Sequence, residues 1–161
     1  MSIDLLAELL HNNMNFVGME VADFSEADML VRPCPGANHT TWQIGHLTVA
    51  EAGMVAGFGA PVPAIPDAYK AKFTKETAKS DDASLFPKKA ETLEQFTKVR
   101  SATVAWAKTL KEADLARQSP EKMRQWCPTL GHLLTMLPVH VAMHVGQIQV
   151  IRRKLGKPIL F

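Results

Sequence analysis

The sequence has few cysteines, little excess charge of one sign and no long uninterrupted apolar run. Cys34 and Cys127 are its two cysteines, which excludes a disulfide-stapled miniprotein and favours free thiols in a reducing cytoplasm. The 18 basic and 16 acidic residues leave a formal net charge of +2, so we expect neither a nucleic-acid nor a membrane-surface partner. No run approaches the roughly 18 apolar residues of a membrane span, and the first residues do not resemble a signal peptide.

What the chain does contain is enough apolar material for one domain. It has 161 residues, of which 47% are hydrophobic and 21% charged. These are ordinary values for a globular protein and exclude a disordered or fibrous chain. We therefore expect a single domain over residues 1–161. The chain also carries six histidines, an unusual count beside its single tyrosine.

Apolar residues recur at spacings of three and four, which predicts four long amphipathic helices. The expected ranges are 3–21, 40–57, 90–111 and 129–155. Ser2 is the expected N-cap of the first helix, and Ser25–Asp28 resembles a capping box that opens a short second piece. A long loop over 58–88 leaves room for a helical turn near 68–73. No alternating β-branched run predicts a strand, so the expected fold is all-α, an antiparallel four-helix bundle with long loops that allow a crossover.

Two histidines on the last predicted helix have the spacing of a helical metal motif. His140 and His144 are four residues apart and so lie one above the other on one face. That face continues an apolar stripe: Leu133, Leu137, Ile148, Ile151 and Leu155. The expected inner stripe of the second long helix is Trp42, His46, Val49, Gly53 and Ala56. The pattern therefore points three histidines, from two helices, into the bundle.

Buried imidazoles need partners for both ring nitrogens, and a shared metal ion would satisfy one nitrogen of each ring. Three neutral histidines suit Zn²⁺, or Ni²⁺ and other first-row metals, and leave a coordination position open as in catalytic zinc sites. The alternative is that these are hydrogen-bonded core histidines without an ion. His11, His39 and His132 are expected at the periphery, with His39 as a capping or loop residue.

Three motifs together resemble the DinB-like superfamily, whose members are also called YfiT-like proteins. They are the stretches Trp42–Leu47, His140–Ile148 and Arg152–Pro158. The resemblance covers nearly the whole chain and implies a four-helix bundle of the DinB/YfiT-like type. It implies His46, His140 and His144 as ligands of Ni²⁺ or Zn²⁺. It also implies a dimer and, in some relatives, a low-molecular-weight thiol as cofactor or substrate.

The sequence departs from that family pattern at two positions near the expected ligands. Val145 replaces a basic residue that is common there, and Pro138 is expected to kink the last helix just before His140. Gln147 lies on nearly the same face as His144 and is a candidate to orient a ligand or a bound water from outside the coordination sphere. The alternative is a half-buried glutamine without a chemical role. Glu51 is expected to one side of His46, so it is not favoured as a general base.

Two functional hypotheses follow. In the first, the ion activates water or a low-molecular-weight thiol for transfer to, or hydrolysis of, a small electrophile. No catalytic acid or base can be named from the sequence. In the second, the chain is a non-catalytic metal-binding or stress-response bundle, since acid–base machinery is missing. The expected partners are a small-molecule substrate and a second copy of the chain, for which the apolar tail at 159–161 is suitable.

Overall fold

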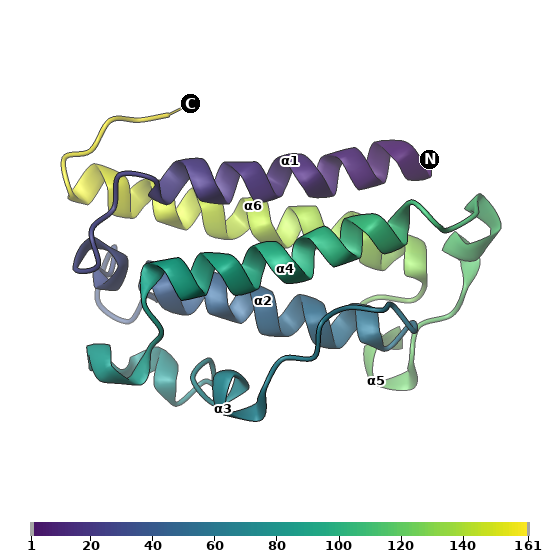
Figure 1. Cartoon of the computed structure of the whole chain (residues 1–161), viewed down its shortest axis with the longest axis horizontal. Coiled ribbons are helices and arrows are strands. Elements are labelled where there is room, and N and C mark those ends of the chain that lie inside the picture. Colours follow the sequence, from purple (N-terminus) through teal and green to yellow (C-terminus); the bar gives the residue numbers. More distant parts are fainter. Residues whose placement is uncertain (1, 161) are drawn as a thin grey trace.

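Four long helices lie side by side in the computed structural model, which describes residues 2–160 (Figure 1). They are α1 (Ile3–Val21), α2 (Thr40–Ala56), α4 (Lys89–Ala107) and α6 (Leu130–Lys154). Over residues 2–160 there is no β-strand, and the one β-type contact is an isolated bridge between Gln118 and Thr129. The predicted all-α four-helix bundle is thus confirmed.

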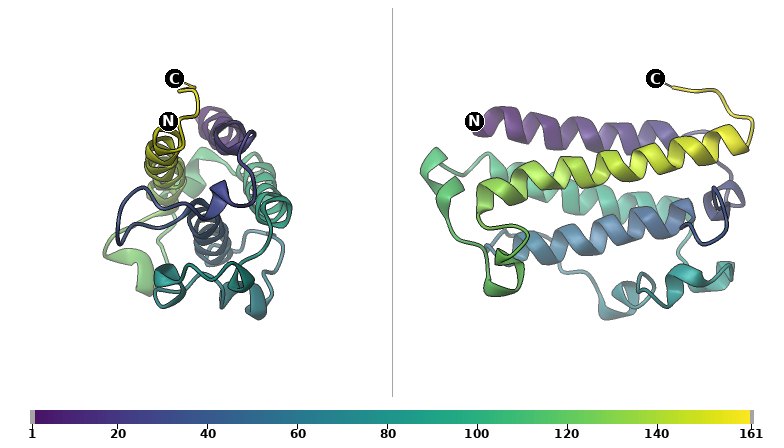
Figure 2. Two further views of the ribbon diagram at one scale, coloured as in Figure 1. Left: turned by 90° about the vertical axis from the view of Figure 1, so that its left-hand side faces the viewer. Right: turned by 180° about the vertical axis from the view of Figure 1, so that it is seen from behind.

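The helices are not arranged in chain order around the bundle. Helix α1 packs on α6 and α4, and α2 packs on α4 and α6, so that α1 and α2 lie diagonally opposite (Figure 2). The neighbours α1 and α6 run in the same direction, as do α2 and α4 (Figure 1). A uniformly antiparallel bundle was therefore the wrong expectation, because the long connections carry the chain across the bundle or back to its starting end.

Short helical elements fill these connections. They are η1 (Asp28–Leu30), α3 (Asp67–Lys70), η2 (Thr77–Lys79), η3 (Ala83–Leu85), η4 (Glu112–Ala116) and α5 (Glu121–Arg124). The turn expected near 68–73 is α3, which begins one residue earlier and is shorter. The long loop between α2 and α4 therefore has local structure of its own along its length.

Local hydrogen bonds explain where the elements begin and end. The expected capping box is present, since the backbone N–H of Ser25 donates to Asp28 Oδ2 and that of Asp28 donates to Ser25 Oγ. Ser2 occupies the N-cap of α1 but makes no side-chain capping bond. Helix α4 ends at Ala107, four residues before the expected end. There the Thr109 hydroxyl donates to the Trp106 carbonyl at 2.7 Å, an alternative to continued helix.

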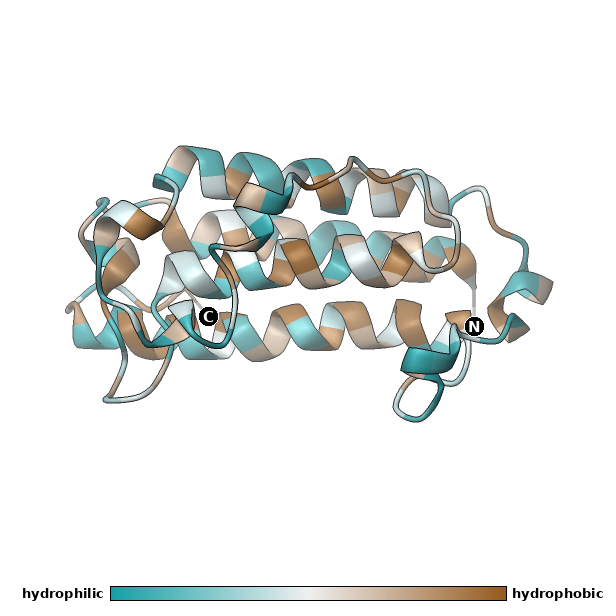
Figure 3. Cartoon of the chain, turned by 90° about the horizontal axis from the view of Figure 1, so that it is seen from below, coloured by the Kyte–Doolittle hydropathy of each residue, from teal (hydrophilic) through white to brown (hydrophobic). Residues whose placement is uncertain are grey.

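The core is divided into two main apolar clusters along the bundle axis. One surrounds Leu10 and Leu133 at the end where α1 begins, and the other surrounds Val21 and Ile148 at the opposite end. Apolar and polar residues alternate along each long helix, because one face is buried and the other is exposed (Figure 3). Between the clusters lies a buried polar layer, defined here as Asn13, Glu51, Arg100 and Thr103. A buried polar layer needs internal partners or a functional reason.

The buried face of α2 differs from the predicted stripe. Gly53 and Ala56 are exposed, and His46 is only half-buried. The residues that face the centre are instead Ile44, Leu47, Thr48, Glu51, Ala52 and Val55. The predicted stripe was turned away from the centre because it was anchored on His46, which lies toward α6 rather than on the bundle axis. One consequence is that Glu51, expected to one side, is buried.

Helix α6 is long and apolar enough to cross a membrane by length and composition, with a mean hydropathy of 1.3 in its most apolar stretch. Within the bundle 44% of that stretch is buried, and core helices of soluble proteins pass the same test of length and composition. Such a match is weak evidence for a membrane span. The helix continues through the buried Pro138.

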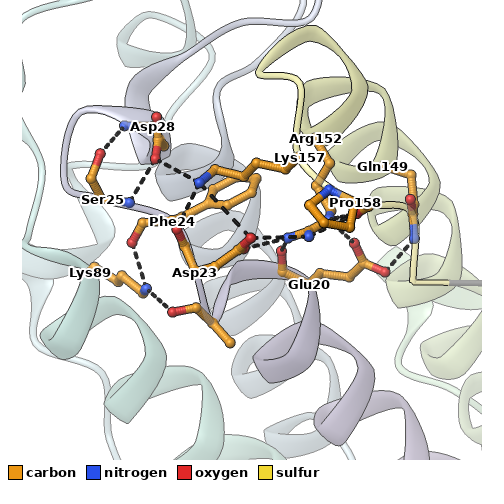
Figure 4. Close-up of polar contacts among 11 residues, drawn as sticks. Glu20, Asp23, Phe24, Ser25, Asp28, Lys89, Gln149, Arg152, Lys157 and Pro158 are labelled. Atoms are coloured by element: carbon orange, nitrogen blue, oxygen red, sulfur yellow. Dashed lines mark hydrogen bonds and ion pairs between the residues drawn. The ribbon is translucent and has the colours of Figure 1, made fainter.

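A second polar cluster ties the end of α1 to the end of α6 (Figure 4). The Arg152 guanidinium is 1% exposed and uses all three of its nitrogens. It donates to the carbonyls of Glu20 and Pro158 and forms an ion pair with Asp23 at 2.6 Å. Gln149 donates to the Glu20 carboxylate. Arg152 thus fastens three segments of the chain together, which its place in a basic helix terminus did not indicate.

Candidate metal centre

His46 from α2 meets His140 and His144 from α6 where these two antiparallel helices pack together. One nitrogen from each ring can be chosen so that all three lie within 4.8 Å of one another. The ring centroids are 5.0 Å apart for His140 and His144, and 5.2 Å apart for His46 and His140. The structure therefore brings together the three histidines that the sequence singled out. A tetrahedral zinc site places its nitrogens about 3.4 Å apart, so small side-chain rotations would draw the rings around an ion.

Gln43 fixes the orientation and tautomer of His144. The Gln43 amide nitrogen donates to the Asn38 carbonyl at 2.7 Å, which leaves its Oε1 as an acceptor. His144 Nδ1 lies 3.0 Å from that oxygen and therefore carries the proton. The lone pair of Nε2 is then free. This chain of hydrogen bonds is typical of the outer partners that orient metal-binding histidines.

Trp42 holds the ring of His46 from one side. The two rings stack with centroids 5.0 Å apart and an interplanar angle of 5°. The indole N–H itself donates to the Thr74 carbonyl at 3.2 Å, which anchors the tryptophan to the loop after α3. The ring of Phe73 from the same loop packs against the backbone at Gly45, where a Cβ would collide with it. The loop thus positions the His46 side of the centre.

Burial keeps all three imidazoles in the neutral form that a metal ion requires. It lowers the pKa of His46 and of His140, the latter further through the nearby His46 and the Arg100 guanidinium. Burial, with the neighbouring His140 and His46, lowers the pKa of His144 to about 4. At neutral pH the centre therefore offers three uncharged nitrogen ligands without the cost of removing protons.

A buried ion pair in the polar layer lies near His140. Arg100 Nη2 on α4 lies 2.6 Å from Glu51 Oε2 on α2, and the side chains are 1% and 3% exposed. Burial raises the pKa of the Glu51 carboxyl, and the Arg100 charge opposes that rise. Arg100 Nε and Nη1 have no hydrogen-bond partner. Unused donors of a buried guanidinium beside the centre call for a ligand, a water or a functional role.

The remaining histidines stay outside the centre. His11 and His132 are exposed, and the His132 backbone N–H is capped by the Thr129 hydroxyl. His39 is the N-cap of α2, where its Nδ1 accepts from the Trp42 backbone N–H at 3.1 Å. The expectation that His39 is a capping residue is confirmed, although the residue is fully buried.

The outer hydrogen-bond partner of His144 is Gln43, a residue that the sequence did not single out. Gln147 is half-buried, and no hydrogen bond joins it to the three histidines in the described part of the chain, so its role stays a prediction. Gln43 makes a contact of the kind considered for Gln147, since it orients His144 from outside the ligand set. The available signal was its position three residues before His46, on the side of α2 that faces α6.

The donor set fits a divalent metal ion. Its ligand atoms are neutral imidazole nitrogens from two rigid helices, one with its tautomer fixed by a buried amide. Such a set suits Zn²⁺ or Ni²⁺ rather than the oxygen-loving Mg²⁺ or Ca²⁺. Three protein ligands leave room for a further molecule on the ion, which is the arrangement of catalytic rather than structural sites.

Comparison with known protein families shows which family the chain belongs to. The family model described as the DinB superfamily matches residues 14–148, which include all three histidines and all four long helices in part or whole. The chain belongs to the DinB superfamily. No protein with a curated description matches it significantly.

Solved structures share the fold of this DinB-superfamily chain. YfiT from Bacillus subtilis, described as a probable metal-dependent hydrolase with an unusual four-helix bundle topology, superposes with a TM-score of 0.70 at 16% identity. The match covers 98% of this chain and 91% of YfiT. A conserved protein from Enterococcus faecalis matches with a TM-score of 0.67 and 16% identity, over 95% of this chain and 96% of its own. The predicted resemblance and the bundle type are confirmed.

Proposed function

We propose that this chain is a divalent-metal-dependent enzyme that acts on a small electrophile by hydrolysis or by transfer of a low-molecular-weight thiol. The observation that carries the proposal is the convergence of His46, His140 and His144 at the seam of α2 and α6. Membership of the DinB superfamily and the description of YfiT support it.

The bound ion would lower the pKa of a water or thiol and so supply a nucleophile near neutral pH. The protein's own contribution is to hold the three rings in place. Gln43 keeps the proton of His144 on Nδ1, and Trp42 prevents the His46 ring from turning. The three-histidine set favours Zn²⁺ or Ni²⁺ as the ion.

The competing proposal is a non-catalytic metal-binding or stress-response bundle. It is favoured by the state of Glu51, the acidic side chain of the polar layer. That carboxylate is held in an ion pair with Arg100 and does not face solvent as a ready proton acceptor. In this case the centre would bind an ion without turnover.

Activity with and without metal separates the two. We expect chelator-treated protein to regain turnover of a nitrophenyl ester, or of chlorodinitrobenzene with a thiol, when Zn²⁺ or Ni²⁺ is added. The double variant His140→Ala/His144→Ala should stay inactive, whereas His11→Ala, at an exposed position on α1, should behave as the parent. Metal uptake without turnover of either class would support the binding role, and metal-independent turnover would contradict both proposals.

We further propose a homodimer that works in the cytoplasm, without nucleic acid or membrane partners. The apolar side chains of Leu5, Leu9 and Met19 are exposed on α1, and Ile159 is exposed near the C-terminus. Phe161, the end of the apolar tail, lies outside the described residues. The free thiols of Cys34 and Cys127 suit a reducing compartment. Light scattering that shows only monomer at high concentration would contradict the dimer.

A further inference from the structure

An apolar pocket lies beside His140, where α2 and α6 meet the loop after α5. Its volume is about 340 Å³, at the lower end of the range for small-molecule sites. Its main lining side chains are Met54, Trp126, Met136, Val139, His140 and Met143. Within residues 2–160, His140 is the one titratable side chain that lines it. The pocket therefore borders the histidine centre through His140 and is otherwise apolar.

Several apolar side chains in the walls of this pocket are exposed to water, which is unfavourable and indicates a function. Trp126 is 53% exposed, Val139 66% and Met143 55%. Clustered apolar side chains around a hollow mark binding sites more often than scattered ones do. Flexible thioethers also adapt to, and pack well against, aromatic groups.

The indole that covers the pocket is held by a well-anchored loop. The Trp126 backbone N–H donates to the Met123 carbonyl at 3.1 Å, and that of Cys127 donates to the same carbonyl at 2.8 Å. Met123 and Cys127 are themselves buried. The loop thus anchors the backbone of Trp126 beside the hollow, which favours a preformed site.

We infer that this pocket binds the uncharged apolar arm, an aryl or branched alkyl group, of the small molecule whose reactive atom lies at the histidine centre. The inference rests on the proposed function and adds the substrate class. His140 belongs to both the pocket and the ligand set, so a molecule on the ion can extend an arm directly into the hollow. A carboxylate or phosphate arm would lose its hydration there without gaining a partner.

Thiol binding to the Co²⁺-loaded protein tests this, because cobalt–thiolate absorption reports binding without turnover. We expect benzyl mercaptan to bind at least about tenfold more tightly than mercaptoethanol, since its ring leaves water. Trp126→Ala and Met143→Ala should reduce that ratio several-fold. Val150→Ala is the matched control, since Val150 is 47% exposed on α6 but does not line the pocket.

The possible failures can be told apart. If Co²⁺ does not bind, the proposed metal centre is wrong, and the pocket is then tested by methionine-methyl NMR during titration with benzyl alcohol. Shifts at Met54, Met136 and Met143 would support the pocket, and their absence would overturn it. If Co²⁺ binds but the ratio is near one, the pocket inference alone is overturned. The same holds if Trp126→Ala converts a dimer into a monomer without changing the ratio, because the hollow is then a subunit interface.

Discussion

Two buried arginines show how differently this bundle uses the same side chain. Arg152, at the end of α6, places all three nitrogens on acceptors from Glu20, Asp23 and Pro158. Arg100, in the middle of α4, has one ion-pair partner in Glu51 and leaves two nitrogens without a hydrogen bond. Both are 1% exposed.

The difference between the two arginines separates a structural role from a role near the histidine centre. A saturated guanidinium that joins three segments behaves as a clamp, and its satisfied hydrogen bonds offset the cost of burial. An incompletely used guanidinium is a poor source of stability. Arg100 stands in the polar layer near His140, and its charge lowers the pKa of that imidazole, after burial and the nearby His46. We therefore connect its burial with the histidine centre rather than with the stability of the fold.

The largest effect is expected at the clamp. Arg152→Ala should lower the free energy of unfolding by about 3–5 kcal/mol, because it removes the cation beside the buried Glu20 carboxylate, which then keeps only its hydrogen bond from Gln149. Affinity for Zn²⁺ in the protein that remains folded should not change. Urea unfolding and metal titration check this, and a loss well below 1 kcal/mol would show that Arg152 is not a clamp.

Replacing the Arg100–Glu51 pair should change the free energy of unfolding in the opposite direction. The double variant Arg100→Met/Glu51→Leu removes both charges and fills the space with apolar atoms. We expect its stability to be unchanged or to rise by about 1–4 kcal/mol, as at other buried pairs replaced in this way. Urea unfolding beside the parent measures this. If the double variant loses as much stability as Arg152→Ala, the two arginines do the same work and the contrast fails.

Gln43, the hydrogen-bond partner of His144, should control metal affinity. Its replacement should change the free energy of unfolding less than Arg152→Ala does. Gln43→Leu removes the acceptor that fixes the His144 tautomer, so we expect Zn²⁺ affinity to fall about 10–100-fold. Gln147→Leu is the matched control, since both glutamines flank the same helix pair. A greater loss from Gln147→Leu than from Gln43→Leu would restore the sequence-based assignment of the outer partner.

Acid should weaken the His39 cap of α2 and the Arg152 clamp over different pH ranges. Burial lowers the pKa of His39 to about 4, so its neutral form stabilises the fold above pH 6.5, and this contribution is lost as pH falls toward 4. The hydrogen bond to Arg152 lowers the pKa of Asp23 below 3.8, so that contribution persists until the pH is below this value. The start of α2, which His39 caps, should therefore weaken before the Arg152 clamp.

Replacing His39 by a capping residue that does not titrate isolates the contribution of its protonation. His39→Asn keeps an acceptor for the Trp42 N–H but has no proton to gain. In metal-free protein, the loss of unfolding free energy between pH 7 and pH 5 should be smaller than in the parent by about 1–2 kcal/mol. Unfolding followed by tryptophan fluorescence at the two pH values measures it. An identical loss in both proteins would show that His39 does not titrate in this range.

The fold was predictable where one face of a helix is continuously apolar. The stripe from Leu133 to Ile151 marked α6 and aimed His144 inward, and the spacing of four residues brought His140 beside it. The buried face of α2 was not predictable in the same way. Its polar core residues, Gln43 and Glu51, lie where a hydrophobic stripe would be sought.

Contacts between segments that are distant in the sequence could not be predicted from the spacing of apolar residues. Arg152 read as a residue of a basic helix end, because Glu20 and Asp23 are far away in the sequence. The same holds for Arg100 and Glu51, whose helices meet only once the bundle forms. Helix directions were also missed, since loop length permits both adjacent and diagonal connections.

Metal stoichiometry tests the central claim most directly. Chelator-treated protein should bind one Zn²⁺ or Ni²⁺ ion per chain in calorimetric titration and elemental analysis. His144→Ala should lose that binding, whereas the exposed His132→Ala, on the same helix, should keep it. Absence of a bound ion in the parent under metal-replete conditions, or a full complement in His144→Ala, would contradict the account.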